Sequence, residues 1–220
     1  MLKAVIFDID GTLLDSVDQH AQAWKETFDQ FGLDIPFSGI RSQIGKGSDK
    51  LLDSLLSPEQ IKLHGEALTE FCAELFKNKF LDSCKPFPDV KTLFEALRAR
   101  DIKIALGSSA KKDEIEVYKN MLQISGLVDE AMSSEDVKRS KPDPDTVTAA
   151  RQRLGGIPSA DCCFIGDSPY DAAAASQDGT QMIGLLCGGF PEEELRSAGA
   201  SEIFWDPSDL LNRWLPGIQL

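Results

Sequence analysis

The chain has 220 residues, 42% of them hydrophobic and 27% charged, with a formal net charge of −13. This composition is typical of a globular protein long enough to bury a core without disulfides or structural metals. The acidic balance argues against nucleic acid as a partner, because nothing supplies a basic field for phosphate backbones, whereas a few local cations or a metal can still attract a small anionic substrate.

The N-terminal segment and the cysteines favour a cytoplasmic protein without a membrane partner. Only four apolar residues follow Lys3 before Asp8, whereas the core of a signal peptide needs about 7–15. No stretch approaches the roughly 20 apolar residues of a membrane span. The five cysteines show no CxxC spacing, which favours reduced thiols over a zinc site or a disulfide framework. The oligomeric state stays open between a monomer and a homodimer.

Short apolar runs predict the strands. The first comes at residues 4–7, and others follow at 102–106, 162–165, 182–186 and 203–205. These runs are apolar on both faces, and amphipathic helical patterns separate most of them. Such alternation is typical of a parallel sheet covered by helices on both sides. We therefore predict a doubly wound, Rossmann-like α/β core.

The region from residue 16 to residue 84 departs from this alternation, because it contains no convincing strand. A helical pattern near its start ends at Gly32, a leucine-rich helix follows near residues 51–56, and one or two more helices are expected from residue 59 to 80. We predict a small all-helical domain at residues 16–84, inserted into a core domain formed by residues 1–15 and 85–220.

Acidic residues directly follow two of the predicted strands. Asp8 and Asp10 follow the first strand, and Asp167 follows the strand at residues 162–165. Parallel strands end at one edge of a sheet, and residues two apart share a face, so these carboxylates are expected in one cleft. Three or four acids suit a hard cation such as Mg²⁺. Taken alone, Asp8 and Asp10 fit a solvated Asp-Gly turn equally well, and Asp171 fits a helix cap.

Two further segments offer partners for an anion. Ser108 and Ser109 follow the strand at residues 102–106 and precede a helix, where hydroxyl and backbone N–H groups suit an oxyanion. Taken alone, each is better explained as a plain helix N-cap. Lys141 lies on a loop stiffened by Pro142 and Pro144, although a lone lysine there is usually a solvated surface charge.

Two residues of the helical region are candidates for substrate contact. Lys46 is flanked by two glycines, and His20 lies in the first predicted helix, near the junction with the core. The competing interpretations are a solvated basic loop for Lys46 and a partly buried structural histidine for His20.

In this order the segments resemble the four motifs of the haloacid dehalogenase-like superfamily. The first motif is residues 8–16, the second is Ser108, the third is Lys141, and the fourth is residues 166–168 with Asp171. The resemblance continues through glycines near residues 179, 188 and 199 and so spans nearly the whole chain. It points to the phosphoglycolate phosphatase and β-phosphoglucomutase-like group, whose cap matches the helical insert in position and size.

The resemblance implies a magnesium-dependent phosphatase acting on a small phosphomonoester. Asp8 is the expected nucleophile and Asp10 the general acid and base. Mg²⁺ is expected at the Asp8 carboxylate, the Asp10 backbone carbonyl and Asp167, with Asp171 behind these ligands. The residues expected to bind phosphoryl oxygens are Ser108, Ser109 and Lys141.

Other reactions of the superfamily fit less well. Asp10 counts against dehalogenases and phosphonoacetaldehyde hydrolases, which lack an acid there. β-Phosphoglucomutases share Asp10 and a histidine at the position of His20, but they usually carry Glu-Asp in place of Gly166 and Asp167, and an arginine near Ser48. These departures favour a phosphatase, and a sugar-phosphate phosphatase is equally compatible. A non-catalytic phosphate-binding or regulatory protein is the alternative from another class.

Overall fold

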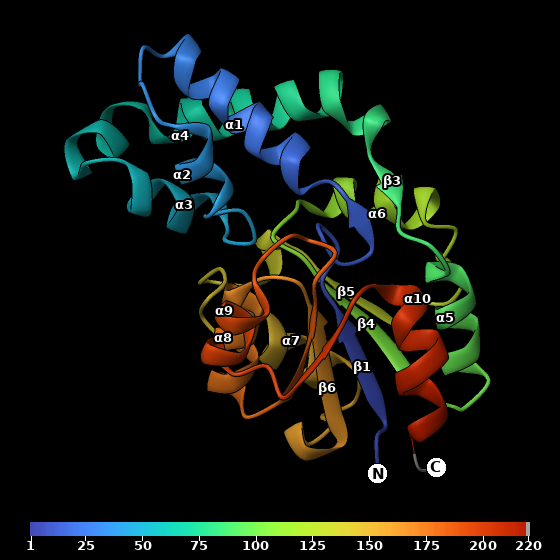
Figure 1. Ribbon diagram of the computed structural model, residues 1–220. Helices are drawn as coiled ribbons and strands as arrows, with labels where there is room; N and C mark the ends of the chain where they lie inside the picture. The colour runs from blue at the N-terminus through green and yellow to red at the C-terminus, as the bar shows by residue number, and fades with distance from the viewer. Residues whose placement is uncertain (219–220) are drawn as a thin grey trace.

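The computed structural model describes residues 1–218 and consists of a parallel sheet with helices on its faces and above one edge (Figure 1). Within these residues the sheet has six strands in the order β5-β4-β1-β6-β7-β8, and every neighbouring pair is parallel. The strands are β1 Ala4–Phe7, β4 Lys103–Gly107, β5 Glu130–Met132, β6 Cys162–Gly166, β7 Gln181–Leu185 and β8 Glu202–Phe204. The predicted α/β core is confirmed.

The two faces of β1 point into two separate parts of the core. Val5 and Phe7 pack into one part, and Ala4 and Ile6 into the other, because successive side chains of a strand point to opposite faces. Helices α5 and α6 contribute to the first part and α7, α8 and α9 to the second (Figure 1). Their bounds are α5 Val90–Arg98, α6 Lys112–Met121, α7 Asp145–Arg153, α8 Pro169–Asp178 and α9 Glu192–Ala198. The chain ends with α10 Pro207–Asp209, η5 Leu210–Trp214 and η6 Leu215–Gly217.

The helices between residues 17 and 83 lie together above the carboxyl edge of the sheet (Figure 1). They are α1 Val17–Gln30, α2 Phe37–Arg41, α3 Ser48–Leu55, α4 Pro58–Leu75, the π-helix η1 Phe76–Phe80 and the short η2 Leu81–Ser83. The chain enters and leaves this group through a two-stranded antiparallel pair, β2 Leu14–Asp15 with β3 Lys85–Pro86. The division into a core domain and a helical cap stays a prediction; below, "cap" means residues 16–84.

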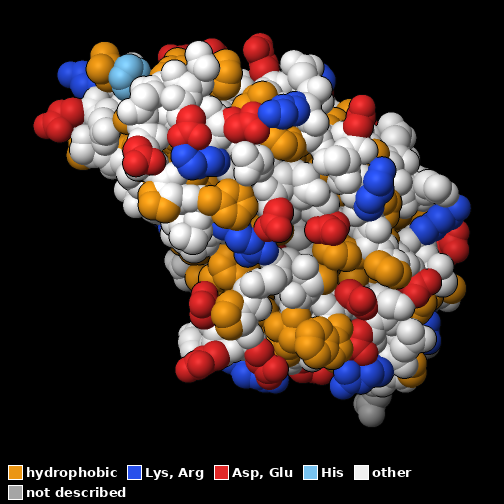
Figure 2. All heavy atoms as spheres, turned by 45° about the horizontal axis from the view of Figure 1, so that its top comes forward, with side chains coloured by type: hydrophobic (Ala, Val, Ile, Leu, Met, Phe, Trp, Pro, Cys, Tyr) orange, Lys and Arg blue, Asp and Glu red, His pale blue; other side chains and the backbone are white. Residues whose placement is uncertain are grey.

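Charge, cysteines and helix lengths add three observations. Acidic and basic side chains are interspersed on the face drawn in Figure 2. All five cysteines are free thiols, and four of them are buried. No helix within residues 1–218 is long and apolar enough to cross a membrane.

Candidate active site

The central strands bring the predicted site residues to one edge of the sheet. Phe7 at the end of β1 pairs with Leu106 of β4 and Ile165 of β6. The next residue, Asp8, donates its backbone N–H to the Ile165 carbonyl oxygen at 2.9 Å. Ser108 directly follows β4, and Asp167 directly follows β6. Each lies one residue further along its strand than the position opposite Asp8.

Lys141 ties two of the acids together. Its Nζ donates to Asp8 Oδ1 at 2.5 Å and to Asp171 Oδ1 at 2.8 Å. The relative exposures of Lys141, Asp8 and Asp171 are 1%, 4% and 0%, so these charges are removed from water. The loop lysine is thus a buried partner of the predicted nucleophile, and the interpretation as a solvated surface charge is wrong.

Asp171 has two structural roles at once. Its Oδ2 accepts hydrogen bonds from the backbone N–H and the hydroxyl of Ser168, which closes a capping box at the start of α8. Its Oδ1 faces Lys141. The helix-cap interpretation is therefore confirmed, and the same side chain also belongs to the charged cluster.

The carboxyl group of Asp167 is held by a hydrogen bond and by closely approaching backbone. Asp167 Oδ1 accepts from Thr12 Oγ1 at 2.9 Å. A Cβ added at Gly188 would lie 1.8 Å from Asp167 Oδ2, and one at Gly11 would lie 2.3 Å from the same atom. Gly11 also has a φ of +84°, which favours glycine. Two glycines therefore line the space around the Asp167 carboxyl that any larger residue would fill.

The three buried acids fit a cation. Ligand atoms of Asp8, Asp167 and Asp171 all lie within 4.8 Å of one another. Burial raises the pKa of Asp8 to about 7, with Asp171 and Asp10 adding to the effect and Lys141 opposing it. Burial, followed by the charges of Asp171 and Asp8, raises the pKa of Asp167 well above its usual value. One ammonium cannot compensate three carboxylates, so a hard cation fits here.

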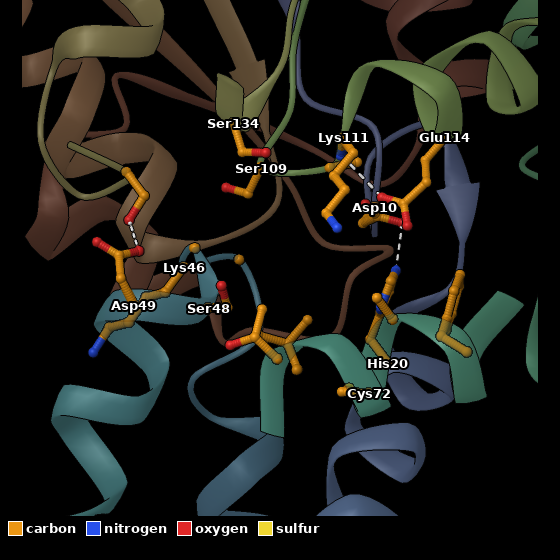
Figure 3. Close-up of a pocket in the computed structure, with 18 of the residues that line it drawn as sticks. Asp10, His20, Lys46, Ser48, Asp49, Cys72, Ser109, Lys111, Glu114 and Ser134 are labelled. Carbon is orange, nitrogen blue, oxygen red and sulfur yellow. Dashed lines mark hydrogen bonds and ion pairs between the residues drawn. The ribbon is translucent and has the colours of Figure 1, made fainter. Parts of the chain in front are cut away.

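The serines behind β4 differ in position. Ser108 is buried, and its Oγ accepts from the backbone N–H of Ala110 at 3.1 Å. Ser109 lines the pocket between the core and the cap (Figure 3). Neither caps α6, whose N-cap residue is Lys111, so the interpretation of these serines as plain helix N-caps is wrong.

Asp10 points toward the cap. Its Oδ1 accepts from Ser16 Oγ at 2.6 Å and lies 2.9 Å from His20 Nε2 (Figure 3). Burial raises the pKa of Asp10, but the charge and hydrogen bond of His20 and the bond from Ser16 outweigh it, so the pKa lies below its usual value. His20 itself stacks on Phe76, with ring centroids 3.8 Å apart and planes 6° from parallel. The imidazole is therefore held against the acid from the cap side.

A pocket of about 270 Å³ lies between the core and the cap. Asp8, Asp10 and Ser109 line its core side, and the cap contributes a largely apolar wall. The members of this cap wall are Trp24, Ile44, Cys72, Ala73 and Phe76. Burial raises the pKa of Cys72 to about 12, so its thiol stays neutral. A small molecule with an anionic end and a neutral body fits this space.

Lys46 lines the same pocket, but its ammonium is already engaged. Nζ donates to Gln43 Oε1 at 2.5 Å and to Ser54 Oγ at 2.7 Å, and it lies 4.6 Å from the ring centroid of Tyr170. Its predicted contact with substrate stays a prediction. In this structure Lys46 links the cap to Tyr170 of the core.

The sequence-based prediction missed two polar residues of this site. Thr12 was part of the first motif but had no assigned role. Glu114 lines the pocket from the first turn of α6. The sequence carried no local signal for it, because Lys111 is not the Ser or Thr with which a capping box begins.

Comparisons with known proteins agree with this arrangement. A family model described as haloacid dehalogenase-like hydrolase matches residues 2–179. A phosphoglycolate phosphatase of Aquifex aeolicus is 27% identical, covering 85% of this chain and 86% of the relative. The fructose-1-phosphate phosphatase YqaB of Escherichia coli is also 27% identical, covering 81% and 94%.

A solved structure shares nearly the whole fold. It is a hydrolase from Pseudomonas syringae with a TM-score of 0.89 and 31% sequence identity, covering 99% of this chain and all of that one. The family match includes Asp8, Ser108, Lys141 and Asp167, the residues that the sheet brings to one edge. The chain therefore belongs to the haloacid dehalogenase-like hydrolase family.

Proposed function

We propose that this hydrolase is a magnesium-dependent phosphatase that cleaves a small phosphomonoester through a covalent phosphate on Asp8. The observation that carries the proposal is the position of Lys141, which holds one carboxylate oxygen of Asp8 inside a buried acidic cluster. Of the two carboxylate oxygens of Asp8, only Oδ1 accepts a hydrogen bond from Lys141, and Asp8 lines the pocket. The second carboxylate oxygen is therefore left to meet phosphorus.

The first step transfers the phosphoryl group to the protein. An Asp8 oxygen forms a bond to phosphorus while the bond from phosphorus to the leaving oxygen breaks, and Asp10 gives that oxygen a proton. Lys141 and the hydroxyl and backbone groups of Ser108 and Ser109 stabilise the charge on the equatorial oxygens. Asp8, Asp167 and the Asp10 backbone carbonyl, with Asp171 behind them, would hold Mg²⁺, which when bound would neutralise charge at the phosphoryl group.

The second step releases phosphate. Asp10 takes a proton from water, the water oxygen bonds to phosphorus, and the bond between Asp8 and phosphorus breaks. The low pKa of Asp10 suits this step, because the carboxylate is ready to accept a proton. In the first step the negative charge of the bound phosphoryl group raises that pKa and so keeps a proton on Asp10 for the leaving oxygen.

A direct assay tests the proposal. We expect the purified protein to hydrolyse p-nitrophenyl phosphate with Mg²⁺ and to lose this activity in excess EDTA, with recovery when Mg²⁺ is restored. Folded protein that hydrolyses neither this ester nor any of a panel of phosphomonoesters would show that the proposal is wrong and would favour the non-catalytic alternative.

The mutase alternative has its own readout. In NMR spectra of β-glucose 1-phosphate incubated with the enzyme, a phosphatase gives glucose and phosphate, whereas a mutase gives glucose 6-phosphate. We expect the first result, because Gly166 and Ser48 depart from the mutase pattern.

A further inference from the structure

Glu114 is a pocket-lining acid that the mechanism above does not use. It lies at the third position of α6, and its Oε2 accepts from the backbone N–H of Lys111 at 2.9 Å. Its Oε1 has no hydrogen-bond partner among the described residues. In Figure 3 its carboxyl group points toward Asp10 and His20. A second carboxyl group therefore lines the same pocket as the acid that is proposed to meet the leaving oxygen.

The electrostatic effects agree with this placement. Burial raises the pKa of Glu114, Asp10 raises it further, and the positive charge of His20 opposes the increase. Asp10 and Glu114 are thus close enough to repel each other. The first atoms of a leaving group beyond the ester oxygen enter this acidic space.

The cations of the same pocket lie elsewhere or are engaged. Lys46 is held by Gln43 and Ser54. Lys111 and Lys138 line the pocket but are exposed to solvent, where water and salt weaken a charge. Opposite them, the cap wall offers carbon surface and a neutral thiol. A carboxylate one carbon from the ester oxygen would thus face Asp10 and Glu114, because His20 is already paired with Asp10 at 2.9 Å and the remaining lysines are exposed.

We propose that Glu114 determines substrate specificity. It disfavours a negative charge one carbon away from the ester oxygen, and it accepts a hydrogen bond from a hydroxyl group at that position. The substrates would then be phosphomonoesters of neutral polyhydroxy alcohols or sugars, whose C–H faces pack on the cap wall, rather than phosphoglycolate. This inference rests on the proposed phosphatase function and specifies the alcohol released by it.

Three small substrates isolate the effect. Glycerol 1-phosphate has a hydroxyl next to the ester carbon, ethyl phosphate has none, and 2-phosphoglycolate has a carboxylate there. For the wild-type enzyme we expect kcat/KM to fall in that order. We expect a preference of about tenfold or more for glycerol 1-phosphate over phosphoglycolate, the size of one like-charge repulsion that solvent partly screens.

The variant Glu114→Gln removes the charge and keeps the shape. Glutamine can still accept the bond from the Lys111 backbone N–H, so this contact at the start of α6 is retained. We expect kcat/KM for phosphoglycolate to rise about tenfold relative to that for glycerol 1-phosphate. The apparent Ki of phosphoglycolate, measured as a competitor of p-nitrophenyl phosphate, is expected to fall in parallel. Asp113→Asn removes a charge from the neighbouring exposed position and is expected to leave the ratio unchanged.

Lys111→Gln tests the opposite explanation, in which Lys111 binds the carboxylate of the substrate. The inference is overturned if the wild-type enzyme prefers phosphoglycolate, or if Glu114→Gln leaves the ratio unchanged while Lys111→Gln lowers turnover of phosphoglycolate. Either result would leave the phosphatase function intact. Absence of magnesium-dependent turnover for every phosphomonoester would instead reject the proposed function.

Discussion

The core side and the cap side of the pocket are built in different ways. On the core side, Asp8 and Asp171 are buried and both accept hydrogen bonds from the buried Lys141, so each side chain is held in one position. On the cap side, apolar groups from α1, α4, η1 and the loop after α2 meet across long sequence separations. We propose that the first arrangement carries out the reaction, whereas the second selects the molecule that undergoes it. The predictions below test that division.

The largest effect is expected from Asp8→Asn. The amide cannot form the acyl phosphate, so kcat should fall by about 10⁴-fold or more, as for loss of other nucleophiles. Circular dichroism and thermal unfolding should still show a folded protein, because an amide of the same size remains beside Lys141. Activity within a hundredfold of wild type would contradict the role of Asp8 as nucleophile.

Gly188→Ala should disrupt the core side of the pocket although no charged residue is replaced. Its Cβ would lie 1.8 Å from Asp167 Oδ2, so the carboxyl or the loop must shift. A displacement of about 1 Å at a catalytic group can cost on the order of 10²-fold in rate. Gly126→Ala is the control, because nothing lies within 4 Å of a Cβ there. Equal kcat values for the two variants would show that the space around Asp167 is not constrained.

The pH dependence of magnesium binding tests the charge of the acidic cluster. Burial raises the pKa of Asp8 to about 7, so this carboxyl holds a proton below that pH and must release it to bind a cation. Through this one group, magnesium affinity should therefore weaken about fivefold from pH 7 to pH 6 and rise only about twofold from pH 7 to pH 8. Calorimetric titrations at pH 6, 7 and 8 measure this change. A flat profile would mean that Asp8 is ionised throughout.

A small effect is expected from Tyr170→Phe. The Tyr170 hydroxyl donates to the Ser42 carbonyl oxygen at 2.5 Å and so links α8 to the cap. One exposed hydrogen bond contributes on the order of 1 kcal/mol, so we expect a two- to fivefold change in KM with kcat within about twofold. A large loss of kcat would instead place this contact in the chemical step.

The difference between the two sides also explains what the sequence could predict. Asp8 and Asp167 each directly follow a buried strand, so a local pattern was enough to locate them. Strand β5, in contrast, was not predicted. It is only three residues long and includes Glu130, so its apolar signal is too weak. The helix α2 was missed for the same reason, since it has five residues.

The role of Glu114 could not be predicted from local patterns. Its position in the sequence is that of an ordinary acidic residue in the first turn of a helix. Its proximity to Asp10 arises only when α6 and the end of β1 meet across the sheet edge, a contact between residues more than a hundred positions apart. The cap wall was missed in the same way, because Trp24 and Phe76 resemble ordinary core residues of amphipathic helices.

The central position of β1 has a consequence for synthesis of the chain. β1 is synthesised before its two neighbours in the sheet, β4 and β6. Ala4 therefore cannot pair until Lys103 and Cys162 have been synthesised. Non-local parallel pairing of this kind folds slowly and exposes unpaired strand edges in the interval. The apolar strand that precedes Asp8 is therefore exposed to aggregation until β4 and β6 have been made, and the acidic cluster can form only after most of the chain has been synthesised.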